Sequence, residues 1–389
     1  MKLGFSLLIV LLSVSACQTK NKPKSVDPSS AWAGKMQDMA VEVRELIPFL
    51  YNPKAFQDPV NAARIKADLQ KFAAKAHEIT PAMGESYFGQ DPMESYSLEG
   101  MRADLSRAAD AFDQGRLEFA RGAAKAATTH CFRCHSVTKE GSRAAWDLSK
   151  FSNLELAPTE KVDLIVAIRR YDEAAKYLET LISDDKYVQN YPFEFENLLR
   201  KYMSLMIRVE NSPERPLREL DRVLKIKNVP VYVLEQARAW RTSLQEWKQD
   251  VGRKNVRKIK NDLLQQAGDR VRRGTQQQQF AKDHAGDIEF LRATRMLHDY
   301  LRTQPPVSKR AEAYLLLGQA YEVLDELGYW NLHEVYYESC IKAAPKTAVA
   351  TKCFGRFEAS IYLGFSGSSG VHIPAQERER LKQLKEMTL

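Results

Sequence analysis

Two cysteines and a histidine stand together in the stretch Cys131-Phe132-Arg133-Cys134-His135. Two thiols three residues apart, with a histidine directly behind the second, form the attachment pattern of c-type haem. Each thiol can add to one vinyl group of the porphyrin, and the adjoining imidazole can then bind the iron as its proximal ligand. The motif therefore predicts covalently bound haem c, with Cys131 and Cys134 as the thioether cysteines and His135 as the iron ligand.

Two other chemistries use closely spaced cysteines, and the surrounding sequence disfavours both. A redox-active disulfide motif is expected beside a strand–helix–strand pattern, whereas this stretch lies in an alanine-rich helical segment. A structural zinc site needs a second pair of ligands. The remaining cysteines of the chain's interior, Cys340 and Cys353, are far away in the sequence. The sequence therefore favours haem c over a redox-active disulfide and a zinc site.

Four amphipathic helices are expected to hold this group. Apolar residues recur at helical spacing, and Asn-Pro, Asp-Pro, Thr-Pro and Asp-Gln-Gly stretches separate the segments. The expected helices cover residues 32–50, 59–79, 97–112 and 117–135. Because the connections are mostly short, the pattern predicts a four-helix bundle with the motif near the end of its last helix.

The fourth of these segments is unusually small on one side. Four alanines, at positions 120, 123, 124 and 127, share the face that continues to Cys131 and Cys134. A flat macrocycle lying against a helix needs small residues there, which favours a seat for the haem. The alternative is that alanine is simply the best helix former.

This helix order, with CxxCH near the end of the fourth helix, resembles the class II cytochromes c, the group of cytochrome c-prime and cytochrome c-556. The resemblance covers about residues 31–150. In that group a residue of the first helix faces the second axial position of the iron. The resemblance implies a six-coordinate iron suited to electron transfer if that residue is methionine. It implies a five-coordinate iron that binds small gases if the residue is apolar.

The first expected helix offers two methionines for this second axial position. Met36 and Met39 lie on the same apolar stripe. We take Met36 as the candidate distal ligand and Met39 as the alternative, although a methionine on such a stripe can equally belong to the core. Five-coordinate members of the group commonly carry an arginine one turn before the distal residue, where this chain has Lys35 relative to Met39. His77 and His130 are weaker alternatives, because His130 adjoins the attached cysteine on the same helix.

The amino terminus has the features of an export signal. Residues 1–16 combine an early lysine with a short apolar stretch, which predicts a cleaved signal peptide. Val14-Ser15-Ala16-Cys17 resembles the lipobox of bacterial lipoproteins, in which the cysteine is diacylated; ordinary secretory cleavage after Ala16 is the alternative. We expect Cys17 to anchor the protein to the bacterial envelope, and the glutamine after it favours the outer membrane, facing the periplasm.

A polar, proline-containing stretch follows the lipidated cysteine, so residues 17–30 are expected to be a flexible tether. By resemblance to other c-type cytochromes, export also agrees with the haem motif, because the thioether bonds are made outside the cytoplasm.

Residues 151–389 are expected to form a second helical domain with internal repeats. Tyr314, Leu317, Gly318 and Tyr321 have the spacing of a repeat helix, and after an insertion come Tyr337, Cys340 and Pro345. These positions resemble the tetratricopeptide (TPR) pattern, in which small and large residues alternate so that paired helices interlock. The fold class predicted for the whole chain is therefore all-α: a four-helix haem domain followed by a TPR-like α-solenoid. A generic helical bundle is the alternative for this second domain.

Two further features bear on this second domain. Cys340 and Cys353 are expected either to form a disulfide in an oxidising compartment or to be small core residues. Between Arg253 and Arg273 there are eight lysines and arginines, in a chain of net charge +8. That stretch either meets an anionic surface or acidic partner, or is a solvated helix face.

These observations predict an electron-transfer protein rather than an enzyme. No pair of carboxylates beside a nucleophile and no serine motif stands out in the haem domain. Solenoid surfaces bind peptides or proteins, so we expect a redox partner or docking protein and no nucleic acid. The alternatives are a haem module that binds or senses a gas such as nitric oxide or carbon monoxide, and an envelope scaffold in which the haem is structural.

Overall fold

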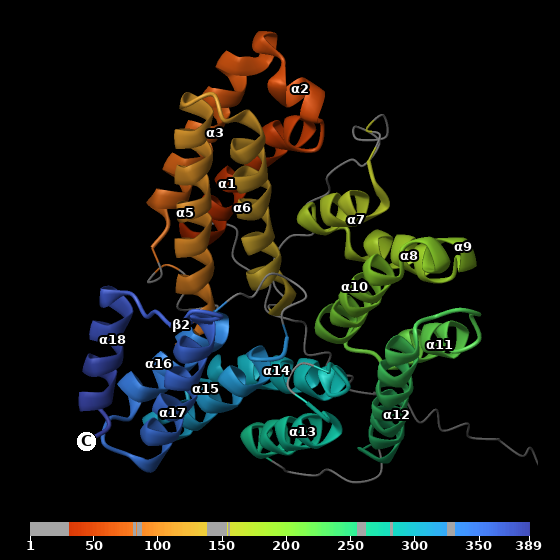
Figure 1. The fold of residues 1–389 in the computed structure, drawn as a ribbon, viewed down its shortest axis with the longest axis vertical. Coiled ribbons are helices and arrows are strands. Elements are labelled where there is room, and N and C mark those ends of the chain that lie inside the picture. The colour runs from red at the N-terminus through yellow and green to blue at the C-terminus, as the bar shows by residue number, and fades with distance from the viewer. Residues whose placement is uncertain are drawn as a thin grey trace, which may run out of the picture.

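The computed structural model describes residues 31–80, 83, 88–137, 154, 156–254, 262–280, 283–324 and 331–389. These residues are almost entirely helical (Figure 1), which confirms the predicted all-α class. The one sheet among them is a small hairpin, in which β1 (Ser366–Gly367) pairs antiparallel with β2 (Gly370–Val371). The expected signal peptide, Cys17 and tether lie outside the described residues.

Four long helices form the part of the molecule drawn in red to ochre in Figure 1. They are α1 (Ala31–Leu50), α3 (Pro59–Glu78), α5 (Met93–Asp113) and α6 (Leu117–Val137), with the short α2 (Pro53–Gln57) between the first two. Helix α1 packs on α3, α3 on α5 and α5 on α6, and α1 also contacts α6. The four helices therefore surround one common core.

Local sequence explains where these helices begin and end. Asp58 caps α3 by accepting a hydrogen bond from the Val60 amide at 3.0 Å, and Pro59 occupies the first helical turn. Gly115, with a φ of 72°, makes the left-handed turn between α5 and α6. Because this turn is tight, α5 and α6 run antiparallel and pack along their lengths.

The middle of the chain, drawn in green in Figure 1, continues as a series of shorter helices. They are α7 (Pro158–Ala167), α8 (Tyr171–Ile182), α9 (Asp185–Asn190), α10 (Pro192–Ser204), the π-helical η2 (Leu205–Glu210), α11 (Glu214–Val223) and α12 (Val231–Lys254). Helix α7 packs on both α6 and α8, so it connects the four long helices with those that follow.

The carboxyl-terminal helices pack mainly as neighbours along the chain. They are α13 (Leu263–Gln277), α14 (Asp287–Leu301), α15 (Val307–Tyr321), α16 (Leu332–Ala343), α17 (Ala348–Gly364) and α18 (Ala375–Glu386). A Cβ atom at Gly318 would lie only 2.3 Å from the Tyr337 ring, so α15 and α16 approach closely at a small residue. Cys340 of α16 and Cys353 of α17 are joined by a disulfide.

Buried apolar residues form two clusters that interlock where the long helices meet the rest of the chain. The first lies among α1 to α6 but also includes Leu164 and Ile168 from the end of α7. The second fills α7 to α18 but also includes Met93 and Phe132 from α5 and α6. Side chains of each part are therefore buried in the core of the other.

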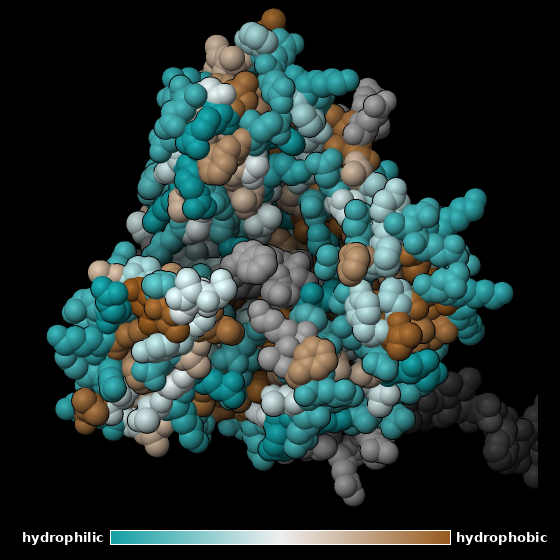
Figure 2. Space-filling model, viewed as in Figure 1, coloured by the Kyte–Doolittle hydropathy of each residue, from teal (hydrophilic) through white to brown (hydrophobic). Residues whose placement is uncertain are grey.

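The surface seen in Figure 2 is mainly hydrophilic, with smaller apolar areas. Two of the most exposed large apolar side chains are Phe193 and Leu363. None of the helices in the described ranges is long and apolar enough to span a membrane.

Candidate haem attachment site

The motif residues occupy the last two turns of α6. Cys131 and Cys134 are partly exposed and form no disulfide, and their spacing of three residues places them on one side of the helix. Cys134 packs against the core of the four long helices. Phe132, which lies between the two cysteines, is instead buried in the second cluster. The two thiols therefore stand where the core of the four helices ends.

The surroundings of both thiols keep them protonated. Burial raises the pKa of Cys134 to about 12, because an apolar environment disfavours the thiolate. The charges of Glu94 and Asp91 raise it further, whereas a hydrogen bond with Ser97 acts in the opposite direction. Burial also raises the pKa of Cys131.

His135 is held as a neutral imidazole. Burial lowers its pKa to about 3, and the nearby Arg169 guanidinium lowers it further. The Nη1 atom of Arg169 lies 3.5 Å from Nε2 of His135. A neutral imidazole keeps a lone pair, which is the form that binds a metal ion. His135 therefore has the protonation state that an iron ligand needs.

Two polar side chains of α5 lie buried beside Cys134. Glu94 is 3 % exposed and Ser97 is 2 % exposed. Within the described residues, Glu94 Oε1 and Ser97 Oγ find no oxygen or nitrogen partner. Burial raises the pKa of Glu94 to about 8, and the negative charge of Asp91 adds to that shift. Buried polar atoms in native proteins are normally satisfied, so these two fit a position next to a group that the protein binds.

A second polar cluster fixes the motif against α5. His130 Nε2 lies 2.8 Å from Asp104 Oδ2, and His130 Nδ1 lies 2.5 Å from an Arg133 guanidinium nitrogen. A Cβ atom at Gly100 would lie 2.3 Å from the His130 ring, so α5 is small where this ring packs. Arg133 also lies over the Tyr96 ring, 5.4 Å from its centroid. His130 therefore points into the interface with α5 and holds the arginine between the two cysteines.

The two candidate methionines differ in burial. Met39 is buried in the core of the four helices, whereas Met36 is partly buried at its edge. Lys35, the residue before Met36, forms an ion pair with Glu78 of α3.

Contacts at the far end of α1 and α6 set the register between them. Arg121 Nη1 donates a hydrogen bond to the Leu50 carbonyl oxygen at 3.0 Å. Met36 lies 14 residues before Leu50, and His135 lies 14 residues after Arg121. Both distances correspond to about 21 Å of helix at 1.5 Å per residue. Because the two helices run in opposite directions, this count brings the first turns of α1, which carry Met36 and Met39, near the end of α6 that carries His135.

The alanine face of α6 has a packing role in this structure. Ala120, Ala124 and Ala127 are buried in the core of the four helices, and Ala123 packs partly against it. These small side chains let the neighbouring helices approach α6. Helix packing, which was not among the interpretations drawn from the sequence, therefore accounts for these three positions.

A buried hydrogen-bonded network, which sequence reasoning missed, joins the start of α5 to the carboxyl-terminal helices. Asp91 Oδ2 lies 2.5 Å from His298 Nδ1, and Asp91 Oδ1 accepts a hydrogen bond from the Tyr336 hydroxyl at 2.8 Å. His298 Nε2 lies 2.8 Å from the Tyr321 hydroxyl. The start of α5 therefore lies beside the motif at Glu94, and Asp91, just before the helix, is held to the carboxyl-terminal helices.

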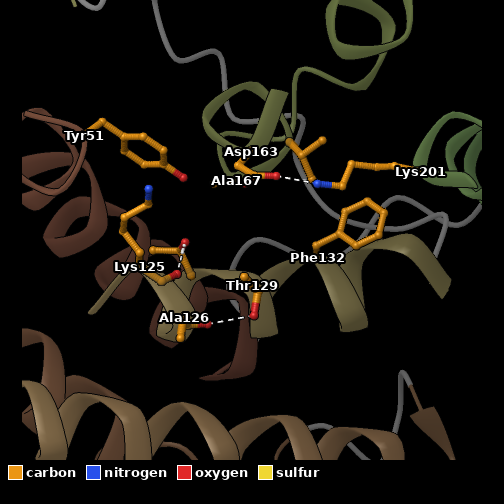
Figure 3. A pocket seen from close by; sticks show the side chains of 10 residues that line it. Tyr51, Lys125, Ala126, Thr129, Phe132, Asp163, Ala167 and Lys201 are labelled. Atoms are coloured by element: carbon orange, nitrogen blue, oxygen red, sulfur yellow. Dashed lines mark hydrogen bonds and ion pairs between the residues drawn. The ribbon is translucent and has the colours of Figure 1, made fainter. Parts of the chain in front are cut away.

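A cavity of about 280 Å³ lies on a neighbouring face of α6 (Figure 3). Its lining residues are Tyr51, Lys125, Ala126, Thr128, Thr129, Phe132, Asp163, Val166, Ala167 and Lys201. Lys125 is paired with Glu160 at 2.9 Å, and Lys201 is paired with Asp163 at 2.5 Å. The cavity therefore offers no net charge, and neither motif cysteine lines it.

The expected basic stretch between Arg253 and Arg273 is described only in part. Its described arginines each have an acidic partner: Arg270 contacts Asp250 and Glu289, Arg272 contacts Asp269, and Arg273 contacts Glu246. The side chains of residues 253–261 lie outside the described ones.

The described part of the chain holds no group of three or more histidine, cysteine, aspartate or glutamate side chains that could bind a metal ion. That finding does not bear on haem, whose iron takes at most two protein ligands. Comparison with protein-family models, curated proteins and solved structures found no match for this chain. The functional assignment therefore rests on the motif and its surroundings.

Proposed function

We propose that this protein binds haem c covalently and transfers electrons in the bacterial envelope. One observation carries the proposal: Cys131 and Cys134 lie on one side of α6 without a disulfide bond, directly followed by the partly buried His135, whose lowered pKa keeps its imidazole neutral. The buried Glu94 Oε1 atom, which has no hydrogen-bond partner among the described residues, supports a bound group beside Cys134.

The architecture that we propose around this site has two parts. The packing of α1, α3, α5 and α6 in a closed ring of neighbours supports a four-helix bundle similar to class II cytochromes c. The close approach of α15 and α16 at Gly318 supports TPR-like interlocking in the carboxyl-terminal helices. The proposed division places the haem domain at residues 31–150 and the repeat domain at residues 151–389.

Each residue of the site has a defined task in this proposal. Cys131 and Cys134 hold the porphyrin by thioether bonds, and His135 supplies the proximal nitrogen. The hydrogen bond between His130 and Asp104 holds the motif against α5, so the end of α6 does not need to rearrange when haem is attached. When bound, the haem supplies an iron that cycles between Fe(II) and Fe(III).

Electron transfer is favoured over gas binding because of Met36. The Arg121–Leu50 contact supports a register in which the turns of α1 that carry Met36 and Met39 come near His135. A methionine as second axial ligand fills the iron's last position, raises its reduction potential and leaves no open position for a gas. We therefore propose His135 and Met36 as the iron ligands, with Met39 as the alternative.

The remaining elements of the proposal concern location and partners. Lipidation of Cys17 would anchor the chain to the envelope membrane, and the net charge of +8 is compatible with an anionic membrane surface. The repeat domain would dock a redox partner protein. We propose no catalytic residues.

Absorption spectra of the purified protein test the ligand assignment. We expect a low-spin spectrum with a weak far-red band in the oxidised state, from sulfur bound to iron. That band should disappear in Met36→Ala and persist in Met39→Ala. Loss of the band only in Met39→Ala would reassign the ligand. A high-spin wild-type spectrum with ready carbon monoxide binding would contradict electron transfer and support the gas-binding alternative.

A further inference from the structure

Arg169 occupies an unusual backbone position directly after α7. Its amide donates to the Val166 carbonyl at 2.9 Å, and the Arg170 amide donates to the Ile165 carbonyl at 3.0 Å. These two hydrogen bonds form a Schellman motif, and Arg169 has a φ of 62°. Glycine normally fills this left-handed position, because other residues are strained there. Gln304 and Lys346 also occupy this conformation, so a reason for an arginine at this point must come from what its side chain contacts.

The side chain of Arg169 supplies that reason. Its guanidinium reaches across to α6, where Nη1 lies 3.5 Å from Nε2 of His135. The turn that carries it is well anchored, because the preceding Ile168 is completely buried in the core of the four long helices. A cation is thus held at the nitrogen of His135 that faces the proposed iron.

We propose that Arg169 is a haem-positioning residue whose guanidinium binds a haem propionate. This inference rests on the proposed function. His135 Nε2 has one lone pair, so the guanidinium and the iron cannot both occupy it. The haem itself brings two carboxylates, and the planar guanidinium fork matches a carboxylate with two parallel hydrogen bonds. Arg169 therefore exchanges its contact with His135 for a propionate when the haem is attached.

This assignment gives the helices after the four-helix region a direct part in the haem site. Arg169 belongs to the turn between α7 and α8, outside the region that resembles class II cytochromes c. A positive charge held beside the haem favours Fe(II) over Fe(III), because the reduced iron carries one positive charge fewer. Arg169 therefore also raises the reduction potential of the haem.

Four variants of the full-length chain test the role of Arg169. Arg169→Gln removes the charge, Arg169→Lys keeps it without the fork, and Arg169→Gly removes the side chain while relieving the backbone. Arg170→Gln is the matched control, because Arg170 is adjacent, carries the same charge and pairs with Glu173 instead. Two measurements are made: the reduction potential of the haem-loaded proteins, and thermal unfolding in a haem-free Cys131→Ala/Cys134→Ala background.

For Arg169→Gly we expect a lower reduction potential in the haem-loaded protein but a higher unfolding temperature in the haem-free background. At a fixed solution potential near the wild-type midpoint, the reduced fraction should fall several-fold in Arg169→Gln and Arg169→Gly. It should fall less in Arg169→Lys and stay unchanged in Arg170→Gln. In the haem-free background, Arg169→Gly should unfold at a higher temperature than its parent, because glycine is unstrained at this φ.

Potentials that are equal in Arg169→Gln and Arg170→Gln would overturn the role of Arg169 while leaving haem binding intact. Absence of covalent haem from the wild-type protein would overturn the proposed function and this role together.

Discussion

The buried aromatic hydroxyls of the carboxyl-terminal helices and the buried polar side chains at the motif end of the four long helices differ in their hydrogen bonding. In the carboxyl-terminal helices the large buried aromatic side chains have partners: the hydroxyl of Tyr337 donates to Glu322 at 2.6 Å, and that of Tyr321 lies 2.8 Å from His298. Beside Cys134, in contrast, Glu94 Oε1 and Ser97 Oγ are buried without an oxygen or nitrogen partner among the described residues.

An unsatisfied buried polar group costs about 1–3 kcal/mol. Such groups also occur in the carboxyl-terminal helices, at Gln277 Oε1 and Arg292 Nη1, so the contrast holds for the aromatic hydroxyls and not for that whole region. The carboxyl-terminal helices also have a disulfide between Cys340 and Cys353, whereas the cysteines of the motif are not disulfide-bonded. The comparison therefore points to the end of α6, and not to the larger core, as the chemical site.

The largest effect is expected at Asp91, where the two regions meet. Asp91→Asn removes the charge that faces His298 and weakens the hydrogen bond from Tyr336. A hydrogen bond to a charged group contributes about 1.5–3 kcal/mol of unfolding free energy, and the Asp91 carboxylate is bonded to both His298 and Tyr336. Chemical denaturation of Asp91→Asn should show this loss, whereas Asp113→Asn, at an exposed pair with Lys66, should change stability by less than about 1 kcal/mol. Equal effects of the two variants would contradict the role of Asp91 as the junction.

The same variant has a defined pH dependence. Burial alone would raise the pKa of Asp91, but the adjacent His298 and the hydrogen bonds to the carboxylate bring it below its ordinary value of 3.8. The stabilisation is therefore fully present above pH 3.8 and is lost as the pH falls through the lower, folded-state pKa. The stability difference between wild type and Asp91→Asn should shrink in that acidic range.

The next largest effect concerns Glu94, the unsatisfied group of the motif end. Its pKa rises from 4.5 to about 8 on folding, because its carboxylate is buried near Asp91. The sign is opposite to that of Asp91: the folded state is favoured below pH 4.5 and loses stability as the pH rises to about 8. Glu94→Gln cannot ionise, so it should gain stability relative to wild type across this range in thermal unfolding scans. Glu99→Gln, on the exposed side of α5, is the control and should show no such trend.

A smaller effect tests the packing of the carboxyl-terminal helices. Gly318→Ala places a Cβ atom 2.3 Å from the Tyr337 ring, so we expect a loss of about 1–3 kcal/mol from overpacking. Gly122→Ala on α6 meets no atom within 4 Å and should instead stabilise by up to about 1 kcal/mol, because alanine is the better helix former. Denaturant titration measures both. Stabilisation by Gly318→Ala would show that α15 and α16 do not interlock there.

Helix positions in the first part of the chain could be read from local sequence. The expected segments 32–50, 59–79 and 117–135 correspond to α1, α3 and α6 within two residues at each end. Capping residues and prolines set these ends. Because each acts only on the nearest turn, the ends can be predicted from the local sequence. Helix α5 begins at Met93 rather than near residue 97, because Asp91 accepts a hydrogen bond from the Met93 amide at 3.0 Å. That aspartate is itself held by the distant His298.

The surroundings of the motif could not be predicted in the same way. Cys131, Cys134 and His135 are recognisable because their chemistry requires a fixed spacing. Arg169 has no such signal: it contacts His135 from 34 positions away in the chain, and its role depends on how α7 packs on α6. The alanine face of α6 was ambiguous between a haem seat and simple helix propensity. Its packing against neighbouring helices depends on contacts that are distant in the sequence.

Covalent haem is the central claim, and one measurement tests it most directly. The full-length chain is produced in a bacterial host that attaches haem to exported c-type cytochromes, and the purified protein is examined by intact-mass spectrometry and by its haem absorption after denaturation. We predict one haem that stays attached under denaturing conditions in the wild type, and none in Cys131→Ser/Cys134→Ser. Cys340→Ser/Cys353→Ser should retain it. A wild-type protein that carries no haem, or that releases it on denaturation, would contradict the account.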